Sequence, residues 1–597
     1  MSASPVTITR VSTAIEDYAV LSNCRSAALV SRWGSIDWLC LPRYDSGSMF
    51  GALLGDESHG AWSLRPSDAT VTRHYDADTF VLVTRWQTAT GVAEVHDAMP
   101  IDEGVEAVVR RVVGISGEVD FVSEVRFRFD YARAVPWVRQ IGDGHAHAIL
   151  AVAGPDAVVL RGPRLIAVDT AHRARWTTVA GESVDSVLQW GPSWREAPAP
   201  IDVDATLKRT IEWWASWAER VQAAGEHAEL VTRSLLVLRA LTHAETGGIV
   251  AAATTSLPEA FGGERNWDYR YVWLRDAALT LVAYIDHGYL DAAHRWRTWL
   301  LRAIAGDPAD VQIMYGIAGE RDLPEREITS LPGYEGARPV RIGNGAVDQY
   351  QADVIGEVMV ALEAARRAGV EETTFSWALQ RTLLDQLVQW VDRPDNGIWE
   401  MRGDPHFFTH SRAMVWAAFD RGIRAVEENG LDGEVDTWRE LRDRLRGDID
   451  AHGVHGGGWF TQHADTDEVD ASLLILPQVG FCAYDDPRML ATVARMEQTL
   501  MPDGWLLRYR TTGVDGLAGD EHPFLACSFW LVGQYARTGR RDDAVALMRR
   551  LTAVANDVGL LSEEYDPKGK RQAGNTPQAL SHLALVGAAD ALGATAP

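Results

Sequence analysis

The side chains best suited to recognising a sugar gather in one stretch, residues 264–276. It holds four aromatic side chains, three arginines and three carboxylates, and an apolar helical run from Ala277 to Tyr284 follows it. Aromatic rings stack on the apolar face of a sugar, while guanidinium and carboxylate groups form paired hydrogen bonds with its hydroxyls. The same composition also fits a buried ion-pair network at the start of a helix. Composition alone leaves both interpretations open.

Two glutamates have surroundings suited to acid–base chemistry on a glycosidic bond. Such hydrolysis needs one carboxylic acid to protonate the leaving oxygen and a second carboxylate to activate water or to attack the anomeric carbon. Glu400 follows Trp399, whose apolar ring would desolvate the carboxyl group and raise its pKa toward that of a proton donor. Glu563 precedes Glu564 and Tyr565 in an anionic cluster, although any exposed loop can contain such a cluster.

Length and composition indicate an ordinary globular protein with two domains, or with one domain and a large additional module. The chain has 597 residues, of which 46% are hydrophobic and 23% charged, and its formal charge is −26. Such a surface repels phosphate backbones and anionic lipids, so we expect neither a nucleic acid nor a membrane as a partner. A small neutral substrate is compatible with it, and a minority of the 23 tryptophans near carboxylates would suit a carbohydrate site.

The N-terminus and the cysteines predict a cytoplasmic protein. Residues 1–5 lack the basic region and apolar core of a signal peptide, and no run of about 18 apolar residues is present. The four cysteines form no CxxC pair, so reduced and mostly buried thiols are expected. We expect no cofactor and no metal. His406 and His410 lie four residues apart, but a third ligand with suitable spacing is missing, and substrate-side or capping roles are favoured.

The first part of the chain, residues 1–204, has the alternation of an antiparallel β-sandwich. Gly, Pro and Asp separate short segments of period-two or β-branched character. The clearest predicted strands are 80–86, 106–113, 122–129 and 147–152. Near residue 204 the apolar period changes to 3.6, which predicts a linker helix within 205–226 and a helical domain over 227–597.

Residues 266–276 read NWDYRYVWLRD and resemble the signature of glycoside hydrolase family 15, which contains glucoamylases, glucodextranases and the bacterial type of trehalase. Residues 34–45 resemble the opening segment of the trehalase-like members, which in the family can lie against the catalytic pocket. The same residues also fit a turn that packs on the core, and this interpretation stays open. The resemblance implies an (α/α)6 toroid of six inner and six outer helices, with the active site at one end. Predicted helices that suit it are 227–243, 273–287, 290–305, 349–368, 371–392, 410–427, 434–449, 469–476, 487–500, 523–537, 540–555 and 575–592.

The resemblance also assigns the two catalytic roles. Residues 398–400 match the segment that carries the family's general acid, which implies this role for Glu400. Residues 562–566 match the segment that carries the general base, which implies this role for Glu563. Met401 stands where fungal members have a second glutamate, so the contacts at the neighbouring subsite differ from the family pattern.

The expected substrate contacts follow from further motif matches. The Trp-x-Arg-Asp motif at 273–276 holds the non-reducing-end glucose in the family, and an Arg-Tyr pair at 508–509 supplies a second arginine to the same sugar. Residues 343–353 look like a segment that lines the pocket, and the turn-rich stretch 306–348 is expected to be functional. The predicted substrate-binding residues are Trp273, Arg275, Asp276, Trp399, Arg508, Glu564 and Tyr565.

The implied function is an inverting, exo-acting α-glucoside hydrolase that releases β-glucose. Segment 34–45 and the predicted cytoplasmic location favour trehalose as substrate, and short α-1,4 or α-1,6 glucooligosaccharides are the alternative. A sugar phosphorylase shares this layout, but it lacks the second carboxylate, so Glu563 favours water as the nucleophile. A non-catalytic sugar-binding protein is a third interpretation. The oligomeric state is left open, with a homo-oligomer as one option.

Overall fold

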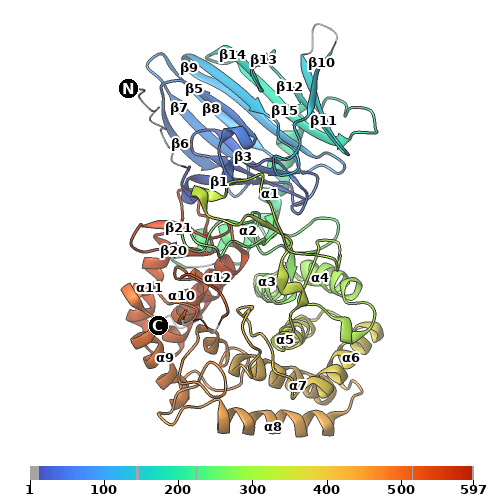
Figure 1. Ribbon diagram of the computed structural model, residues 1–597, viewed down its shortest axis with the longest axis vertical. Helices are drawn as coiled ribbons and strands as arrows, with labels where there is room; N and C mark the ends of the chain where they lie inside the picture. Colours follow the sequence, from blue (N-terminus) through green and yellow to red (C-terminus); the bar gives the residue numbers. More distant parts are fainter. Residues whose placement is uncertain (1–11, 143–146, 224, 512, 514, 595–597) are drawn as a thin grey trace, which may run out of the picture.

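The computed structural model describes residues 12–142, 147–223, 225–511, 513 and 515–594. They form two stacked parts, β-sheets at the top of Figure 1 and a ring of helices below. Within the described part of the chain, no helix combines the length and apolar character needed to cross a membrane.

The upper part is a β-sandwich whose two antiparallel sheets share one long strand, β9. The first half of β9 pairs with β8 and β15, and its second half pairs with β5 and β14, so it passes from one sheet into the other. This confirms the predicted fold of the first part. The strands are β1 Tyr18–Ser22, β2 Ala27–Ser31, β3 Ser35–Cys40, β4 Ser48–Phe50, β5 Ala61–Pro66, β6 Thr70–Tyr75, β7 Leu82–Gln87, β8 Gly91–Ala98, β9 Ala107–Arg126, β10 Trp137–Ile141, β11 Ala148–Ala153, β12 Asp156–Arg161, β13 Ile166–Val168, β14 Ala171–Val179 and β15 Ser183–Pro192.

The predicted strands 106–113 and 122–129 are not separate elements, because both belong to β9. Gly114 and Gly117 lie between them and look like turn residues in the sequence. A Cβ at Gly114 would lie 2.1 Å from the carbonyl oxygen of Val179, so this glycine permits two backbones to pack closely within the sheet. Gly117 has a φ of +62° and pairs with Gly91 beside a register shift between β8 and β9.

The lower part is a ring in which inner and outer helices alternate along the chain, after the connecting helix α1 (Val203–Ala218). The inner elements close a circle through successive contacts of α3, α5, α7, η7, α10 and α12, and each outer helix packs on an inner one. The helices are α2 Ala228–Ala240, α3 Leu274–Asp286, α4 Leu290–Ala303, α5 Asp353–Arg367, α6 Thr374–Trp390, α7 Thr409–Asn429, α8 Val435–His452, η7 Ala471–Ile475, α9 Pro487–Thr499, α10 Leu525–Arg537, α11 Arg541–Thr552 and α12 Ala579–Ala594. This is the predicted (α/α)6 arrangement.

One inner position differs from the prediction. The α-helix expected over 469–476 is a 3-10 helix, η7, whose N-cap Asp470 accepts a hydrogen bond from the Ser472 backbone N–H. Pro477 follows the C-cap residue Leu476, and its missing N–H and fixed ring prevent the turn from growing into an α-helix.

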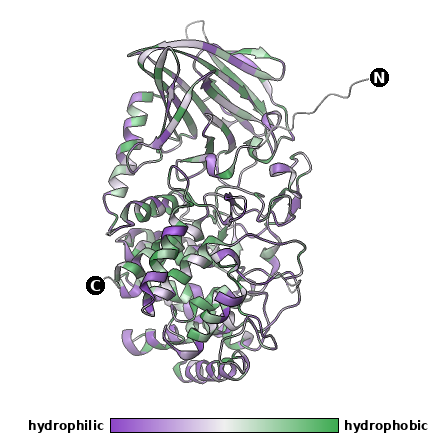
Figure 2. Ribbon diagram, turned by 90° about the vertical axis from the view of Figure 1, so that its left-hand side faces the viewer, coloured by the Kyte–Doolittle hydropathy of each residue, from purple (hydrophilic) through white to green (hydrophobic). Residues whose placement is uncertain are grey.

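Burial separates the inner from the outer helices. The outer helix α8, lowest in Figure 1, buries Trp438, Leu445 and Ile449 and is mostly purple in Figure 2. The inner helix α12 instead buries apolar residues around most of its circumference. A helix that is apolar on all sides must lie inside the fold, which fits the position of α12 between α2, α3 and α10.

The loops that enter the inner helices carry the predicted site residues. Trp273 is the N-cap of α3, and Glu400 lies in the loop before α7. Arg508 and Glu563 lie in the segments before α10 and α12. Helix N-termini carry partial positive charge, so carboxylates and sugar oxygens are favoured near them.

Candidate active site

A cavity with about 720 Å³ of empty space lies among these loops. This volume includes space that is open to solvent. Residues that come from distant parts of the chain line it, so the fold brings them together. The predicted site residues that line it are Trp273, Arg275, Asp276, Trp399, Glu400, Arg508 and Glu563.

Glu400 is held by the indole of Trp273. The Trp273 Nε1–H donates a hydrogen bond of 2.5 Å to Glu400 Oε1, and the Arg275 guanidinium lies 3.8 Å from the same oxygen. The backbone of Glu400 has a φ of +59°, a left-handed conformation that is strained for a non-glycine residue and typical of functional positions. Burial raises the pKa of Glu400, while Arg275 and the Trp273 hydrogen bond lower it in part.

Glu563 is held by the phenol of Tyr269. The Tyr269 hydroxyl donates a hydrogen bond of 2.8 Å to Glu563 Oε1, while Glu563 Oε2 is buried with no hydrogen-bond partner among the described residues. A Cβ at Gly574 would lie 2.7 Å from Glu563 Oε2, so a larger residue there would displace the carboxylate. Burial and the neighbouring carboxylate of Glu259 raise the pKa of Glu563.

The two donors, Tyr269 and Trp273, are neighbours in the stretch singled out in the sequence. Their rings meet edge to face with centroids 5.5 Å apart. Each therefore fixes one carboxylate, and their contact fixes the two carboxylates relative to each other. Two carboxylates that line one cavity and are held in this way have an arrangement that acid–base chemistry on a glycosidic bond requires.

The same stretch also contains the ion pair that the alternative interpretation expected. Asp268 and Arg270 are fully buried and pair at 2.7 Å. Arg270 donates hydrogen bonds to the hydroxyl of Tyr131 at 2.8 Å and to the carbonyl of Ser46 at 3.0 Å. These partners belong to the β part, so this pair docks the stretch onto the sandwich. Tyr269, between Asp268 and Arg270, lines the cavity.

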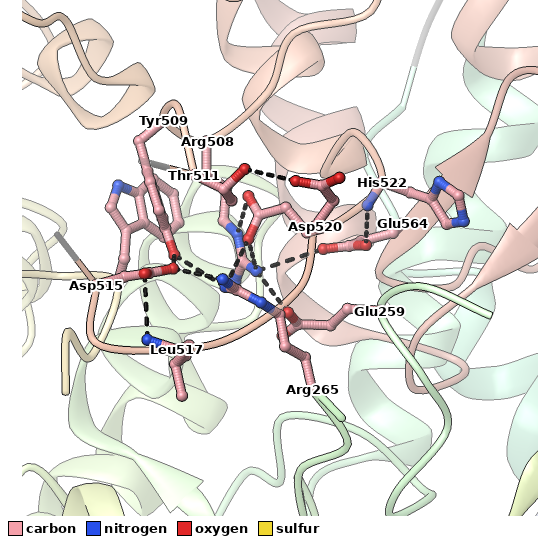
Figure 3. Close-up of polar contacts among 12 residues, drawn as sticks. Glu259, Arg265, Arg508, Tyr509, Thr511, Asp515, Leu517, Asp520, His522 and Glu564 are labelled. Atoms are coloured by element: carbon pink, nitrogen blue, oxygen red, sulfur yellow. Dashed lines mark hydrogen bonds and ion pairs between the residues drawn. The ribbon is translucent and has the colours of Figure 1, made fainter. Parts of the chain in front are cut away.

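A network of arginines and carboxylates forms another wall of the cavity (Figure 3). Arg508 donates to Glu521 Oε2 at 2.6 Å and to Glu259 Oε2 at 2.9 Å. Arg265 pairs with Asp515 at 2.5 Å and lies 3.4 Å from Glu521. Because each guanidinium contacts more than one carboxylate, the network fixes Arg508 in a single orientation against the cavity.

Arg275 and Asp276 retain hydrogen-bonding capacity for a ligand. Both are buried in the first turn of α3, and Arg275 Nε lies 3.4 Å from Asp276 Oδ1. Apart from this long contact, neither atom has a partner among the described residues. Buried polar groups without partners are costly, so both atoms suit a ligand that brings hydroxyl groups.

Two of the predicted substrate contacts do not line the cavity. Glu564 is fully buried behind Arg508, where it accepts a hydrogen bond of 3.0 Å from the backbone N–H of His522. The Tyr565 ring packs against Trp505 with centroids 4.8 Å apart. Both lie in β20 (Glu564–Asp566), and the contacts of these two side chains lie outside the cavity.

Segment 34–45 also stays behind the cavity wall. Trp38 is buried, and its Nε1–H donates to the carbonyl of Ala253 at 3.1 Å. Arg43 pairs with Asp45 and lies 2.8 Å from Glu320. The segment therefore supports the helical part without lining the cavity.

The described residues contain one group of carboxylates close enough to share a metal ion, Glu259, Glu563 and Glu564, whose oxygens lie within 4.8 Å of one another. The guanidinium of Arg508 lies 2.9 Å from Glu259 and 3.4 Å from Glu564, so its positive charge partly neutralises these carboxylates.

His410, the second histidine of the predicted pair, is buried. Burial lowers its pKa to about 3, which keeps the ring neutral.

The sequence did not single out three residues that the structure places at the centre of the site. Tyr269 and Trp267 belong to the aromatic stretch, but nothing local shows that they bind Glu563 and Glu259. Glu259 has no motif around it. Its partners Arg508 and Glu563 lie far along the chain, so only the fold reveals its place.

Comparisons with known proteins identify the family and the fold. The profile described as "Glycosyl hydrolases family 15" matches residues 225–590, and that described as "Trehalase-like, N-terminal" matches residues 8–190. A curated "Trehalase" of Mycolicibacterium smegmatis is 37% identical, and the alignment covers 96% of this chain and 90% of that protein. A curated "Trehalase" of Thermoplasma volcanium is 32% identical over 96% of this chain and 92% of its own. A bacterial glucoamylase crystallised with acarbose has a similar fold, with a TM-score of 0.73, 14% identity, and 99% of this chain and 96% of its own chain covered.

Proposed function

Because the chain belongs to glycosyl hydrolase family 15, we propose that this glycoside hydrolase is a trehalase, which converts α,α-trehalose to two glucose molecules. The curated trehalases support this substrate, since they are similar over both the β part and the helical part. The observation that carries the proposal is the pair of glutamates, Glu400 and Glu563, which line one cavity and are each held by an aromatic donor.

Glu400 is proposed as the general acid. The Trp273 N–H donates to Oε1, so this oxygen acts as an acceptor and the acidic proton resides on Oε2. Burial keeps the carboxyl group protonated to higher pH than an exposed glutamate. The proton then passes from Oε2 to the glycosidic oxygen as the bond to the anomeric carbon breaks.

Glu563 is proposed as the general base. Its Oε1 accepts a hydrogen bond from the Tyr269 hydroxyl, whereas Oε2 has no hydrogen-bond partner among the described residues and could accept a proton from water. Water activated on the side of the sugar opposite Glu400 attacks the anomeric carbon and inverts it. One glucose is therefore released as the β anomer, and the leaving glucose keeps its α configuration.

Arg275, Asp276 and Arg508 are proposed to bind the sugar whose anomeric carbon is attacked. All three are charged, buried and on the cavity wall. The second sugar is proposed to lie toward Trp267 and Arg402, which stack with 4.3 Å between the guanidinium carbon and the ring centroid. Arg402 is exposed, and its guanidinium pairs at 2.6 Å with Glu325, in the turn-rich segment 306–348.

Substrate choice is tested by measuring glucose release from trehalose, maltose and isomaltose, each with and without phosphate. We expect trehalose to have the highest kcat/KM of the three substrates and to yield glucose without added phosphate. Faster hydrolysis of maltose would support the glucoamylase-like alternative. Glucose phosphate formed only in the presence of phosphate would support a phosphorylase.

A cytoplasmic location is part of the proposal. The four cysteines are free thiols, and Cys24, Cys40 and Cys527 are buried. Thiols persist in reducing compartments, so this supports the cytoplasm.

A further inference from the structure

A second cavity lies at the seam between the β part and the helical ring, and it shares no lining residue with the active-site cavity. It encloses about 1550 Å³, including space that is open to solvent. Segments 23–25 and 101–103 of the β part line one side. Helix α1, the end of α2 and the start of α4 line the other. The proposed reaction uses none of these residues.

The lining of this seam cavity is unusually basic for the protein. It contains five arginines and four carboxylates, although the chain as a whole has a formal charge of −26. Most of these arginines have a carboxylate partner. Arg209 pairs with Asp102 at 2.7 Å, and Arg220 and Arg295 pair with the same residue, Asp291, at 2.6 and 3.2 Å.

Arg239 is the exception. It is 8% exposed, and the carbonyl of Thr242, at 2.8 Å, is the one hydrogen-bond acceptor found for it among the described residues. No carboxylate of the described chain forms an ion pair with it, and its guanidinium carbon lies 5.2 Å from the ring centroid of Trp213. Arg239 lies in the last turn of α2, where the partial negative charge of the helix end favours a cation. Most of its five N–H donors nevertheless have no acceptor among the described residues.

A second buried arginine lies on the same cavity. Arg25 is also 8% exposed, and its Nε donates to Glu245 Oε1 at 3.0 Å while its Nη1 donates to the carbonyl of Asp102 at 3.2 Å. The Glu245 side chain is 68% exposed, so solvent weakens this ion pair, but the mostly buried carboxylate of Glu106 also lies 3.6 Å from the same Nε. Arg25 is therefore already neutralised in part and would contribute less to binding an anion than Arg239.

We propose that the seam cavity binds a small oxyanion, a phosphate or carboxylate group, with Arg239 as its principal ligand and Arg25 beside it. A buried cation without a counter-ion is costly, and an oxyanion would fill the free donors of Arg239 with charge-assisted hydrogen bonds. The oxyanion is either a free ion or the charged group of a sugar derivative. In the second case the sugar ring lies against Trp213 and Trp217, which line the same cavity.

Isothermal titration calorimetry of the full chain at low salt tests this site, with inorganic phosphate and glucose 6-phosphate as probes. We expect saturable binding that Arg239→Gln weakens by about tenfold or more, because one charge-assisted contact contributes at least that factor. Arg444→Gln is the matched control, since it removes the same charge from the surface of α8, where Arg444 pairs with Asp392, and it should bind like the wild type.

Arg239 is buried, so a variant that leaves the core intact is also needed. Arg295→Glu meets this requirement because the Arg295 side chain is 48% exposed on the cavity lining, and we expect it to weaken binding by a few-fold at low salt. Equal affinity for phosphate and glucose 6-phosphate would show that the site recognises the oxyanion alone. Tighter binding of glucose 6-phosphate would show that the sugar ring also contacts Trp213 and Trp217.

Three results would overturn the proposal. One is the absence of saturable binding of either probe at millimolar concentration. Another is an unchanged affinity in both Arg239→Gln and Arg295→Glu. The third is binding that survives in Arg239→Gln but disappears in Asp276→Ala, because it would place the probe in the active-site cavity.

Discussion

Glu400 and Glu563 line one cavity but lie in different electrostatic surroundings. The Glu400 side chain is 22% exposed, and its nearest cation is Arg275. Glu563 is 1% exposed and adjoins Glu259 and Glu564, with Arg508 as the cation that all three share. Burial raises the pKa of both carboxyl groups, and for Glu563 a neighbouring carboxylate raises it further.

This difference links each side of the pH profile to one region of the site. A general base must be ionised, and the pKa of Glu563 is raised to about 8, so at low pH the rate is proportional to the ionised fraction of Glu563. A general acid must be protonated, so activity falls as pH rises through the pKa of Glu400. The carboxylate cluster around Arg508 therefore controls the acidic limb, and the loop that carries Glu400 controls the alkaline limb.

Replacing Glu563 has the largest expected effect. Glu563→Gln should lower kcat/KM by at least about a hundredfold for both trehalose and α-glucosyl fluoride, because both substrates need activated water. Steady-state rates for the two substrates measure this effect. A rate on the fluoride close to that of the wild type would show that Glu563 is not the base.

The Glu400 variant distinguishes the proposed acid from the proposed base most clearly. Glu400→Gln should lower the rate on trehalose by at least about a hundredfold, whereas α-glucosyl fluoride should still react because fluoride leaves without a proton. The same assays apply. Equal loss on both substrates, or no loss on either, would contradict the assignment of Glu400 as the acid.

Asp276 tests the recognition of the attacked sugar on the Glu400 side. Asp276→Ala removes a buried charged partner and should lower kcat/KM between about tenfold and a hundredfold for both substrates. The melting temperature is measured alongside. An unchanged kcat/KM would remove Asp276 from the sugar site, and a collapsed fold would identify it as a structural residue instead.

The two aromatic donors form a matched pair of tests. Tyr269→Phe removes the hydrogen bond that lowers the pKa of Glu563, so the acidic limb should move to higher pH and kcat should fall by about tenfold. Trp273→Phe removes the donor that lowers the pKa of Glu400, so the alkaline limb should move to higher pH. Rate profiles across pH measure both shifts. A shift of the same limb in both variants would refute the division into two regions.

Replacing Glu259 should have the smallest effect, confined to one limb of the pH profile. Glu259→Gln removes a negative charge that raises the pKa of Glu563, so the acidic limb should move to lower pH while the alkaline limb stays in place. The pH dependence of kcat/KM on trehalose measures this shift. Glu468→Gln, which removes the same charge outside the cavity lining, should leave both limbs unchanged.

The sequence predicted the features that are carried by contiguous residues. The sandwich, the alternating helices and the segments around Glu400 and Glu563 each have a local pattern. Prediction failed where a distant part of the chain decides the structure. β9 is continuous because Gly114 lets the backbone at the distant Val179 pack closely. The short η7 is a local exception, because Pro477, two residues after it, could have been recognised in the sequence.

The same reasoning explains the limits of the site prediction. Tyr269 binds Glu563, which is 294 residues away in the chain, so no local pattern links them. Glu259 joins the network only through the fold. Glu564 and Tyr565 follow Glu563 in a matched motif, but their side chains contact His522 and Trp505 outside the cavity.

Proton NMR of the first products from trehalose tests the inverting mechanism most directly. If Glu563 activates water opposite Glu400, its carboxylate stands about 6.5–9.5 Å from that of Glu400, and only the attacked carbon inverts. Each turnover then releases one β-glucose and one α-glucose, which appear in equal amounts before mutarotation. Two α-glucose molecules per turnover at early times would contradict the mechanism and the role of Glu563 as the base.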